Sequence, residues 1–171
     1  VRHAINQFRV DVFGPLAREL TFEFGADDSS ELRELRSTVI SAAAAAGDAW
    51  TLSEIHRRFA PLHDGDDSLI HPDLMRVIFA QSVRHGGEKE YDTVLSIYEK
   101  PATPAHKNAA MLALGAASDE KLIQRTLDIV FSDKVKTQDY MYFFAALSNN
   151  IKSRRQLWET VKRRFDDLVK S

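Results

Sequence analysis

The sequence has no cysteine and little glycine or proline, with 7 glycines and 5 prolines in 171 residues. The lack of cysteine excludes disulfide bonds, thiolate zinc sites and cysteine nucleophiles, and it suits a reducing compartment. An all-β domain needs a turn about every ten residues, and so more glycine and proline. No apolar run approaches the roughly 20 residues of a membrane span, and the first residues lack the pattern of a signal peptide. We therefore expect a single compact domain with no membrane partner.

Neither sign of charge dominates the chain. Its 23 lysines and arginines nearly balance 25 aspartates and glutamates. Because nucleic-acid binding usually requires a strongly basic domain, we expect no nucleic-acid partner. Residues 132–171 reverse the sign, with 9 basic against 5 acidic residues. Such a segment could attract an anionic partner, although solvated helix faces produce the same count more often.

Apolar residues are spaced as in α-helices through almost the whole chain. Leu32, Leu35 and Val39 fall three or four residues apart, as do Leu157 and Val161. No segment of four or more residues alternates strictly with β-branched enrichment, so we expect no sheet. We predict an all-α chain of about nine helices, near residues 7–24, 30–46, 52–60, 72–85, 88–99, 104–114, 119–131, 138–148 and 154–169.

Capping patterns set these expected boundaries. The segments Thr51–Glu54 and Ser153–Gln156 have the form of capping boxes, in which two side chains satisfy free backbone N–H groups. Thr103 precedes a proline, which suits the first helical position because no N–H is needed there. The left-handed residue that ends a helix is expected at three glycines, Gly47, Gly86 and Gly115.

The helix starts recur at a nearly constant interval. Thr103 and Thr137 are 34 residues apart, and Ser118 and Ser153 are 35 apart. Antiparallel helix pairs at such a period, joined by short linkers, are typical of an α-solenoid of the HEAT or armadillo kind. A compact helical bundle would give the same periodicity. Spacing alone leaves both architectures open, and the solenoid is our prediction.

The stretch IHPDLMRVIFAQSVRHGG gathers two histidines, an aspartate and two arginines. Asp73 lies in the expected first turn, where negative charge is favoured, and can reach Arg76 three residues later. Arg84 lies in the last turn, where positive charge complements the carbonyl end. His71 suits the capping position. Because each polar residue has a structural role, helix-end chemistry explains this stretch better than catalysis does.

Motifs of common enzymes are absent. No histidine is followed by glutamate, so the zinc-protease motif H-E-x-x-H does not occur. No glycine spacing matches a nucleophile elbow, a dinucleotide fingerprint or a phosphate loop. The segment HDGDDSLIH, residues 63–71, could hold a divalent ion, but its spacing fits no EF-hand loop. A solvated acidic loop is more frequent there, and we expect neither a metal site nor an independent enzyme.

Three segments carry a family pattern. HPDLMRVIFAQSVRHGGEKEYDTVLSIYEK is similar to a pattern of D-L-R, then a helix, G-G and an acidic aromatic stretch, and DDSSELRELRSTVISAAAAAGD resembles the helix before it. ASDEKLIQRTLDIVFSDKVKTQDYMYFFAALSNNIKSRRQLWETVKRRFDDL has K-x-Q-D opening a helix and a tryptophan helix after it. Together they resemble the C-terminal helical domain of M1 zinc aminopeptidases, of the puromycin-sensitive and yeast-type cytosolic branch. Two departures are the insertion of Met75 and NNIKS in place of N-P-x-G.

In that family the zinc site and the amine-recognition motif G-A-M-E-N lie in earlier domains, and neither is in this sequence. The resemblance implies that residues 1–171 form one non-catalytic solenoid domain of a cytoplasmic aminopeptidase. Zinc is then a cofactor of the parent enzyme's catalytic domain, and none is expected here. The implied partners are that catalytic domain and the peptide substrate. The implied task is to enclose the active-site chamber and hold the far end of the peptide.

The resemblance also implies basic residues that bind the substrate's C-terminal carboxylate. Lys134 and Lys136 precede an expected helix N-terminus, whose free N–H groups favour an anion. Arg154 is a further candidate, since a cation on a rigid support suits a carboxylate. The alternative for the lysines is a solvated loop. For the whole chain, the alternative is a free-standing solenoid adaptor that binds a protein partner through its concave face.

Overall fold

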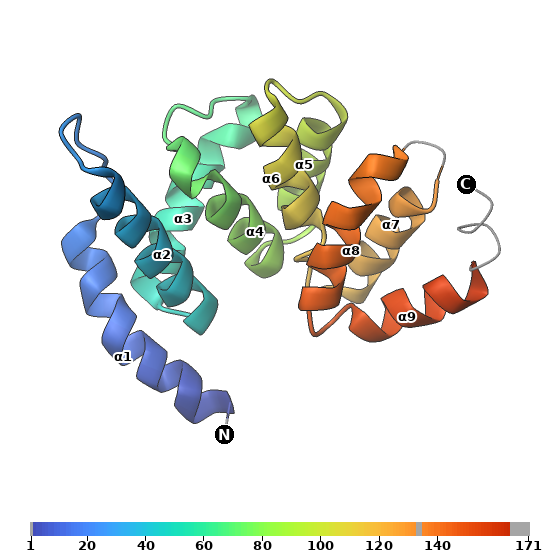
Figure 1. Ribbon diagram of the computed structural model, residues 1–171, viewed down its shortest axis with the longest axis horizontal. Helices are drawn as coiled ribbons and strands as arrows, with labels where there is room; N and C mark the ends of the chain where they lie inside the picture. Colours follow the sequence, from blue (N-terminus) through green and yellow to red (C-terminus); the bar gives the residue numbers. More distant parts are fainter. Residues whose placement is uncertain (1, 133–134, 165–171) are drawn as a thin grey trace. The chain divides into compact units, whose positions relative to one another are not determined.

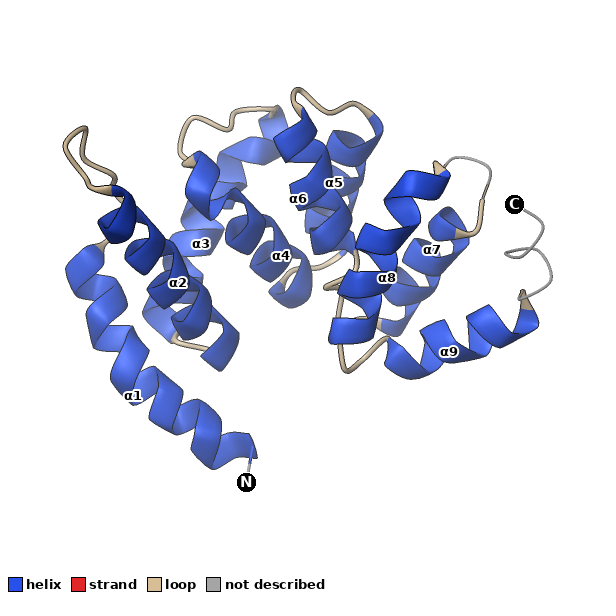
Figure 2. Cartoon of the chain, viewed as in Figure 1, coloured by secondary structure: helices blue, strands red, loops and turns tan. Residues whose placement is uncertain are grey.

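The computed structural model describes residues 2–132 and 135–164 (Figure 1). Every regular element within these ranges is helical and none is a strand, which confirms the all-α prediction (Figure 2). No helix in this part of the chain is long and apolar enough to cross a membrane. The α-helices are α1 (Arg2–Leu20), α2 (Ser30–Ala46), α3 (Ala49–Phe59), α4 (Met75–His85), α5 (Glu88–Glu99), α6 (Pro104–Leu114), α7 (Glu120–Val130), α8 (Tyr140–Asn149) and α9 (Arg154–Arg163).

The chain divides into two compact units, Val1–Ser82 and Val83–Ser171. In the first unit, α1 packs against both α2 and α3. In the second, α5 packs on α6 and α8 packs on α9, while α6 also meets α8 and α7 meets α9. Stacking of equivalent helices from successive pairs is how a helical repeat array buries its core. The second unit thus has solenoid-like packing.

Each unit has its own apolar core. Large side chains at the helical spacing predicted from the sequence fill both cores, and helix pairs bury them because an isolated amphipathic helix cannot. The largest fully buried side chains are Ile40, Ile55, Phe59, Leu74, Ile78 and Phe79 in the first unit, and Tyr91, Met111, Leu114, Ile123, Leu127 and Phe143 in the second.

The expected first helix, residues 7–24, is displaced toward the N-terminus. It spans Arg2–Leu20 and ends where Thr21 adopts a left-handed φ of 55°. Phe22, which helical spacing had placed in this helix, lies in the following loop and is only 3% exposed. The guanidinium of Arg58 lies 4.4 Å from its ring centroid. This tertiary contact, which sequence spacing does not show, holds the loop in place.

Of the six predicted end signals, four are wrong and two are confirmed. The wrong ones are the capping boxes at Thr51 and Ser153 and the left-handed residues at Gly86 and Gly115, since Gly86 does not have a positive φ. Helix α3 begins at Ala49, because the Asp48 carboxylate accepts hydrogen bonds from the Thr51 backbone N–H (2.9 Å) and hydroxyl (2.7 Å). Gly115 is right-handed, at φ −71°, and a Cβ there would lie 2.4 Å from the Ala146 Cβ. Its small size therefore permits the close approach of α6 and α8. The confirmed signals are the cap at Thr103 and the left-handed Gly47.

The capping box expected at Ser153 does not form either. Ser153 is the residue before α9, but its side chain makes no capping hydrogen bond to that helix. Its hydroxyl donates backward to the carbonyl of Leu147, at 2.7 Å. Ser153 is fully buried, so its hydroxyl requires a partner and takes the nearest free carbonyl at the end of α8.

Candidate functional site

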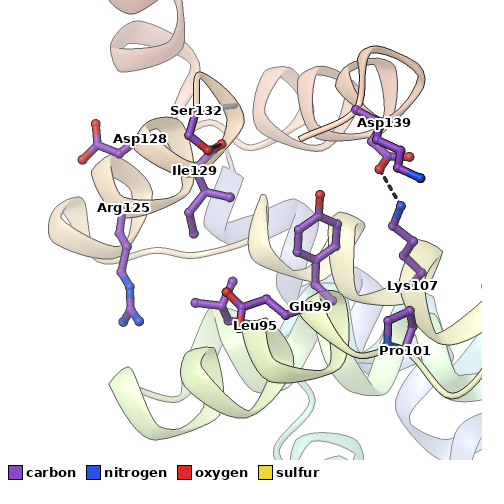
Figure 3. Close-up of a pocket in the computed structure, with 11 residues that line it drawn as sticks. Leu95, Glu99, Pro101, Lys107, Arg125, Asp128, Ile129, Ser132 and Asp139 are labelled. Carbon is purple, nitrogen blue, oxygen red and sulfur yellow. Dashed lines mark hydrogen bonds and ion pairs between the residues drawn. The ribbon is translucent and has the colours of Figure 1, made fainter. Parts of the chain in front are cut away.

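The second unit contains a cavity of about 670 Å³. Figure 3 shows that its labelled side chains come from α5, α6 and α7 and from the segment that leads into α8. Two adjacent helix pairs therefore build it, which places it on rigid elements. Its lining residues are Leu95, Tyr98, Glu99, Pro101, Lys107, Arg125, Asp128, Ile129, Ser132, Lys136 and Asp139.

One wall of the cavity is an ion pair between α6 and the start of α8. The Lys107 ammonium lies 2.6 Å from the Asp139 carboxylate (Figure 3). Asp139 is only 4% exposed. The same ammonium lies 5.7 Å from the ring centroid of Tyr98, which meets Phe143 edge to face. The charge of Lys107 is therefore satisfied within the protein.

The other walls combine an apolar surface with a phenol. Leu95, Pro101 and Ile129 supply apolar lining. Burial raises the pKa of Tyr98, and the negative charges of Asp139 and Glu99 raise it further. Its hydroxyl therefore keeps its proton at neutral pH and can donate a hydrogen bond to a ligand.

The second cation of the cavity is also paired. The Arg125 guanidinium lies 2.6 Å from Asp92 and 3.9 Å from Glu88, and it covers the ring of Tyr91 at 5.0 Å. Lys136 differs, because it is exposed and makes no side-chain hydrogen bond or ion pair with the residues the structure describes. Of the three lining cations, Lys136 is the one whose charge is open to a ligand.

The three basic residues predicted from the sequence do not form one site. Lys136 lines the cavity. Arg154 lines a separate groove, where its Nε donates to the Ser148 carbonyl at 2.9 Å. Lys134 lies outside the described residues. Sequence reasoning missed Lys107 and Tyr98, and the only signal for Lys107 was its place in the first turn after the Thr103 cap.

The helix end expected to attract an anion already holds a carboxylate. A 3₁₀ turn, Thr137–Asp139, precedes α8, and Asp139 occupies the N-cap position. Its negative charge lies at the positive end of the helix dipole. A ligand carboxylate in the cavity would therefore depend on Lys136 for its attraction.

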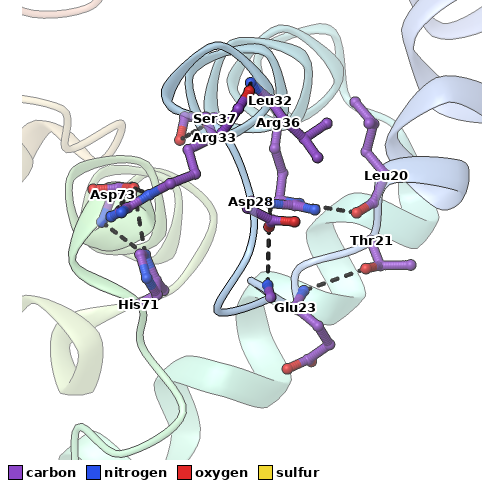
Figure 4. Close-up of polar contacts among 12 residues, drawn as sticks. Leu20, Thr21, Glu23, Asp28, Leu32, Arg33, Arg36, Ser37, His71 and Asp73 are labelled. Atoms are coloured by element: carbon purple, nitrogen blue, oxygen red, sulfur yellow. Dashed lines mark hydrogen bonds and ion pairs between the residues drawn. The ribbon is translucent and has the colours of Figure 1, made fainter.

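A second polar cluster, in the first unit, has a structural role (Figure 4). The Arg36 guanidinium donates to Leu20 O at 2.9 Å and pairs with Asp28 at 2.6 Å. A hydrogen bond from Gly25 and the pairing with Arg36 hold the pKa of Asp28 below its usual value. The cluster fastens the loop between α1 and α2.

The polar residues of the stretch that begins at Ile70 also serve structure. His71 caps the following 3₁₀ turn, because its Nδ1 accepts from the Asp73 N–H at 3.2 Å. The predicted Asp73–Arg76 contact is wrong, since Asp73 pairs with Arg33 of α2 at 2.9 Å (Figure 4). The fold brings Arg33 close from 40 residues away in sequence.

The histidine and acidic residues do not assemble a metal centre in the part of the chain that the structure describes. No group of three or more potential metal ligands lies together there, and residues 63–71 are no exception. Their side chains do not fit a catalytic zinc, which needs three protein ligands around an open position.

Comparisons with known proteins agree with this architecture. The alanine/arginine aminopeptidase of Saccharomyces cerevisiae is 28% identical over 170 residues, which cover 99% of this chain and 20% of the relative. The mitochondrial aminopeptidase 2 of the same yeast is 29% identical over 98% of this chain and 18% of its own length. The puromycin-sensitive aminopeptidase of Caenorhabditis elegans is 25% identical over 90% of this chain and 16% of its own length.

The chain thus spans about a fifth of the length of the yeast relatives it matches. The model of the ERAP1-like C-terminal domain family matches all of residues 1–171. The likeness to aminopeptidases also runs over nearly the whole chain and not over one motif. The chain therefore belongs to the ERAP1-like C-terminal domain family, as a C-terminal domain of the M1 aminopeptidases.

Proposed function

We propose that this chain is the non-catalytic C-terminal domain of a zinc-dependent M1 aminopeptidase, and that it encloses the active-site chamber and binds the far end of the peptide. Family membership supports the setting. The observation that supports the binding role is Lys136, a cation that has no partner among the described residues, at a cavity where Lys107 and Arg125 are both paired. The catalytic zinc is assigned to the rest of the parent polypeptide.

The cavity offers three contacts to a peptide end. The C-terminal carboxylate pairs with the Lys136 ammonium, and the Tyr98 hydroxyl donates a hydrogen bond to it. The last side chain packs on the apolar wall that includes Leu95 and Ile129. Because Lys136 is exposed, its ion pair is worth about 0.2–1 kcal/mol, which corresponds to a change of up to about fivefold in affinity.

The test is Lys136→Ala in the full-length parent enzyme. We expect KM to rise about two- to fivefold for peptides with a free C-terminal carboxylate, because the ion pair is lost. The same peptides with an amidated C-terminus, and a short chromogenic amide, should be unaffected. Lys121→Ala is the matched control, since Lys121 is also exposed in the second unit but does not line the cavity.

Equal effects on the free-acid and amidated peptides would contradict the carboxylate role of Lys136. The alternative of a free-standing adaptor is tested separately by the parent reading frame. An H-E-x-x-H motif upstream of residue 1 supports the aminopeptidase. The similarity to aminopeptidases over nearly the whole chain already favours an enzyme domain.

A further inference from the structure

A second hollow in the second unit has a different chemical character from the cavity at Lys136. It is a groove of about 400 Å³ formed by α8 and α9. The groove is lined by Trp158, a large hydrophobic side chain that is 60% exposed. Its lining residues are Phe144, Ser148, Arg154, Leu157, Trp158 and Val161.

The apolar surface continues along α8 beyond the groove. Met141 lies three residues before Phe144, so the two share one face of the helix. Met141 is 73% exposed. Tryptophan, methionine and arginine are enriched where proteins meet other polypeptides. The face formed by Met141, Phe144 and Trp158 therefore has the composition of an interface.

Among the described residues, the one charged side chain that lines the groove is that of Arg154. Arg154 donates from Nε to the carbonyl of Ser148, a neutral acceptor. Within the described ranges it has no carboxylate partner, whereas the neighbouring Lys162 is paired with Glu159 at 2.9 Å. A segment that fits the groove would therefore present apolar side chains to Trp158 and a carboxylate to Arg154.

We propose that the groove is the docking site for a segment of the parent aminopeptidase that lies outside residues 1–171, with apolar side chains seated against Trp158 and an acidic side chain paired with Arg154. About four-fifths of each yeast relative lies outside the matched region, so the parent has ample chain to supply it. A permanent contact within one polypeptide removes the tryptophan from water continuously. A substrate would do so only while bound.

This inference rests on family membership and uses neither Lys136 nor its cavity. Its outcome is therefore independent of the kinetic result for Lys136→Ala. A failed kinetic test with a successful docking test would remove the substrate role and keep the docking surface. A successful kinetic test with a failed docking test would keep the substrate role and remove the docking surface.

The experiment is photo-cross-linking in the full-length parent enzyme, with Trp158 replaced by p-benzoylphenylalanine. This change keeps an aromatic group on an exposed position, so folding should be retained and circular dichroism would show it. We expect mass spectrometry to find an intramolecular cross-link to one segment outside residues 1–171 that contains apolar residues beside Asp or Glu. The cross-link should form equally with and without a peptide substrate.

Two further variants make the result specific. The same photoreactive residue at Tyr142, which is 44% exposed on α8 but does not line the groove, should not label that segment. Arg154→Glu should lower the yield of the cross-link at least severalfold, and replacing the acidic residue of the labelled segment by lysine should restore it. Such a rescue identifies the carboxylate partner.

Three results would overturn the proposal. A cross-link between two copies of the enzyme would make the groove an oligomer interface. A cross-link to an added peptide, in place of a segment of the enzyme, would make it a substrate site. A folded protein with no cross-link would show that the groove stays open to water.

Discussion

Two cations of the first unit and two of the second differ in their burial and pairing. In the first, Arg36 and Arg58 are 6% and 5% exposed, each lies over a phenylalanine ring, and each is paired with an acidic side chain. In the second, Lys136 and Arg154 are exposed on the rims of hollows and have no acidic partner among the described residues. Loss of a buried and paired cation destabilises a fold because its partner and its packing contacts are lost, whereas an exposed cation without a partner can attract a ligand.

The largest effect should follow loss of a cation from the first unit. Arg58→Ala removes the pairs with Glu54 and Glu23 and exposes Phe22, so we expect the free energy of unfolding to fall on the order of 2–3 kcal/mol. Thermal unfolding followed by far-UV circular dichroism measures this. The matched control is Arg57→Ala, because Arg57 is the exposed neighbour and should change stability by less than about 0.5 kcal/mol.

Equal losses from Arg57→Ala and Arg58→Ala would contradict the structural role of the buried cation. They would also remove the main difference between the two units. A loss confined to Arg58→Ala would sharpen that difference, because the two residues are adjacent in sequence and share Glu54 as a partner.

An intermediate loss of folding stability is expected when the pH is lowered. Although burial of Asp48 raises its pKa, hydrogen bonds from Thr51 and the charge of Arg18 lower it more, so the folded-state pKa is below the usual value. The stabilisation is then fully present above the unfolded-state pKa of about 3.9 and is lost as pH falls through the folded-state value. Because the carboxylate caps α3, the loss is on the order of 1 kcal/mol.

The measurement compares melting temperatures at pH 7 and pH 3 for the wild type and for Asp48→Asn. The asparagine keeps an N-cap acceptor but does not titrate, so the variant should lose less stability on acidification. An unchanged difference between the two pH values would show that Asp48 does not contribute to the acid response. That result would mean that titratable groups other than Asp48 cause the pH dependence of the first unit.

The smallest effect should follow loss of Lys136, an exposed cation of the second unit. Lys136→Ala removes a side chain that has no partner among the described residues, so we expect a change in stability of less than about 0.5 kcal/mol. The same thermal unfolding assay measures it. A loss comparable to that of Arg58→Ala would mean that Lys136 serves the fold, and it would weaken its assignment to substrate.

Helix positions followed closely from local patterns. Some errors at helix ends arose from near neighbours, since Asp48 and not Thr51 caps α3, and others arose where a distant residue intervened. Gly47 and Thr103 act within their own helix ends, so their roles could be read from neighbours in sequence. The role of Gly115 depends on Ala146 of another helix, which local spacing does not reveal. The loop after α1 departs from the predicted helix for the same reason, since Arg58, 36 positions after Phe22, holds it in place.

The substrate role of the basic residues stays a prediction, and the structure shows only where two of them lie. The family resemblance pointed to Lys136, which lines the cavity, and to Arg154, which lines another hollow. It did not reveal that Lys107 is neutralised, because its partner Asp139 is 32 residues away. Whether a lysine is paired depends on which helices meet, and periodicity does not encode that.

By itself, the sequence determined the helices, most of their ends and the family pattern, because capping and amphipathic spacing act over three or four neighbouring residues. Only the tertiary structure decided which charges are paired and where hollows form. Ion pairs and cavities arise where side chains from separate helices meet, so Lys107 is paired with Asp139 while Lys136 has no partner among the described residues. Function depends on this pairing of charges and on where the hollows form.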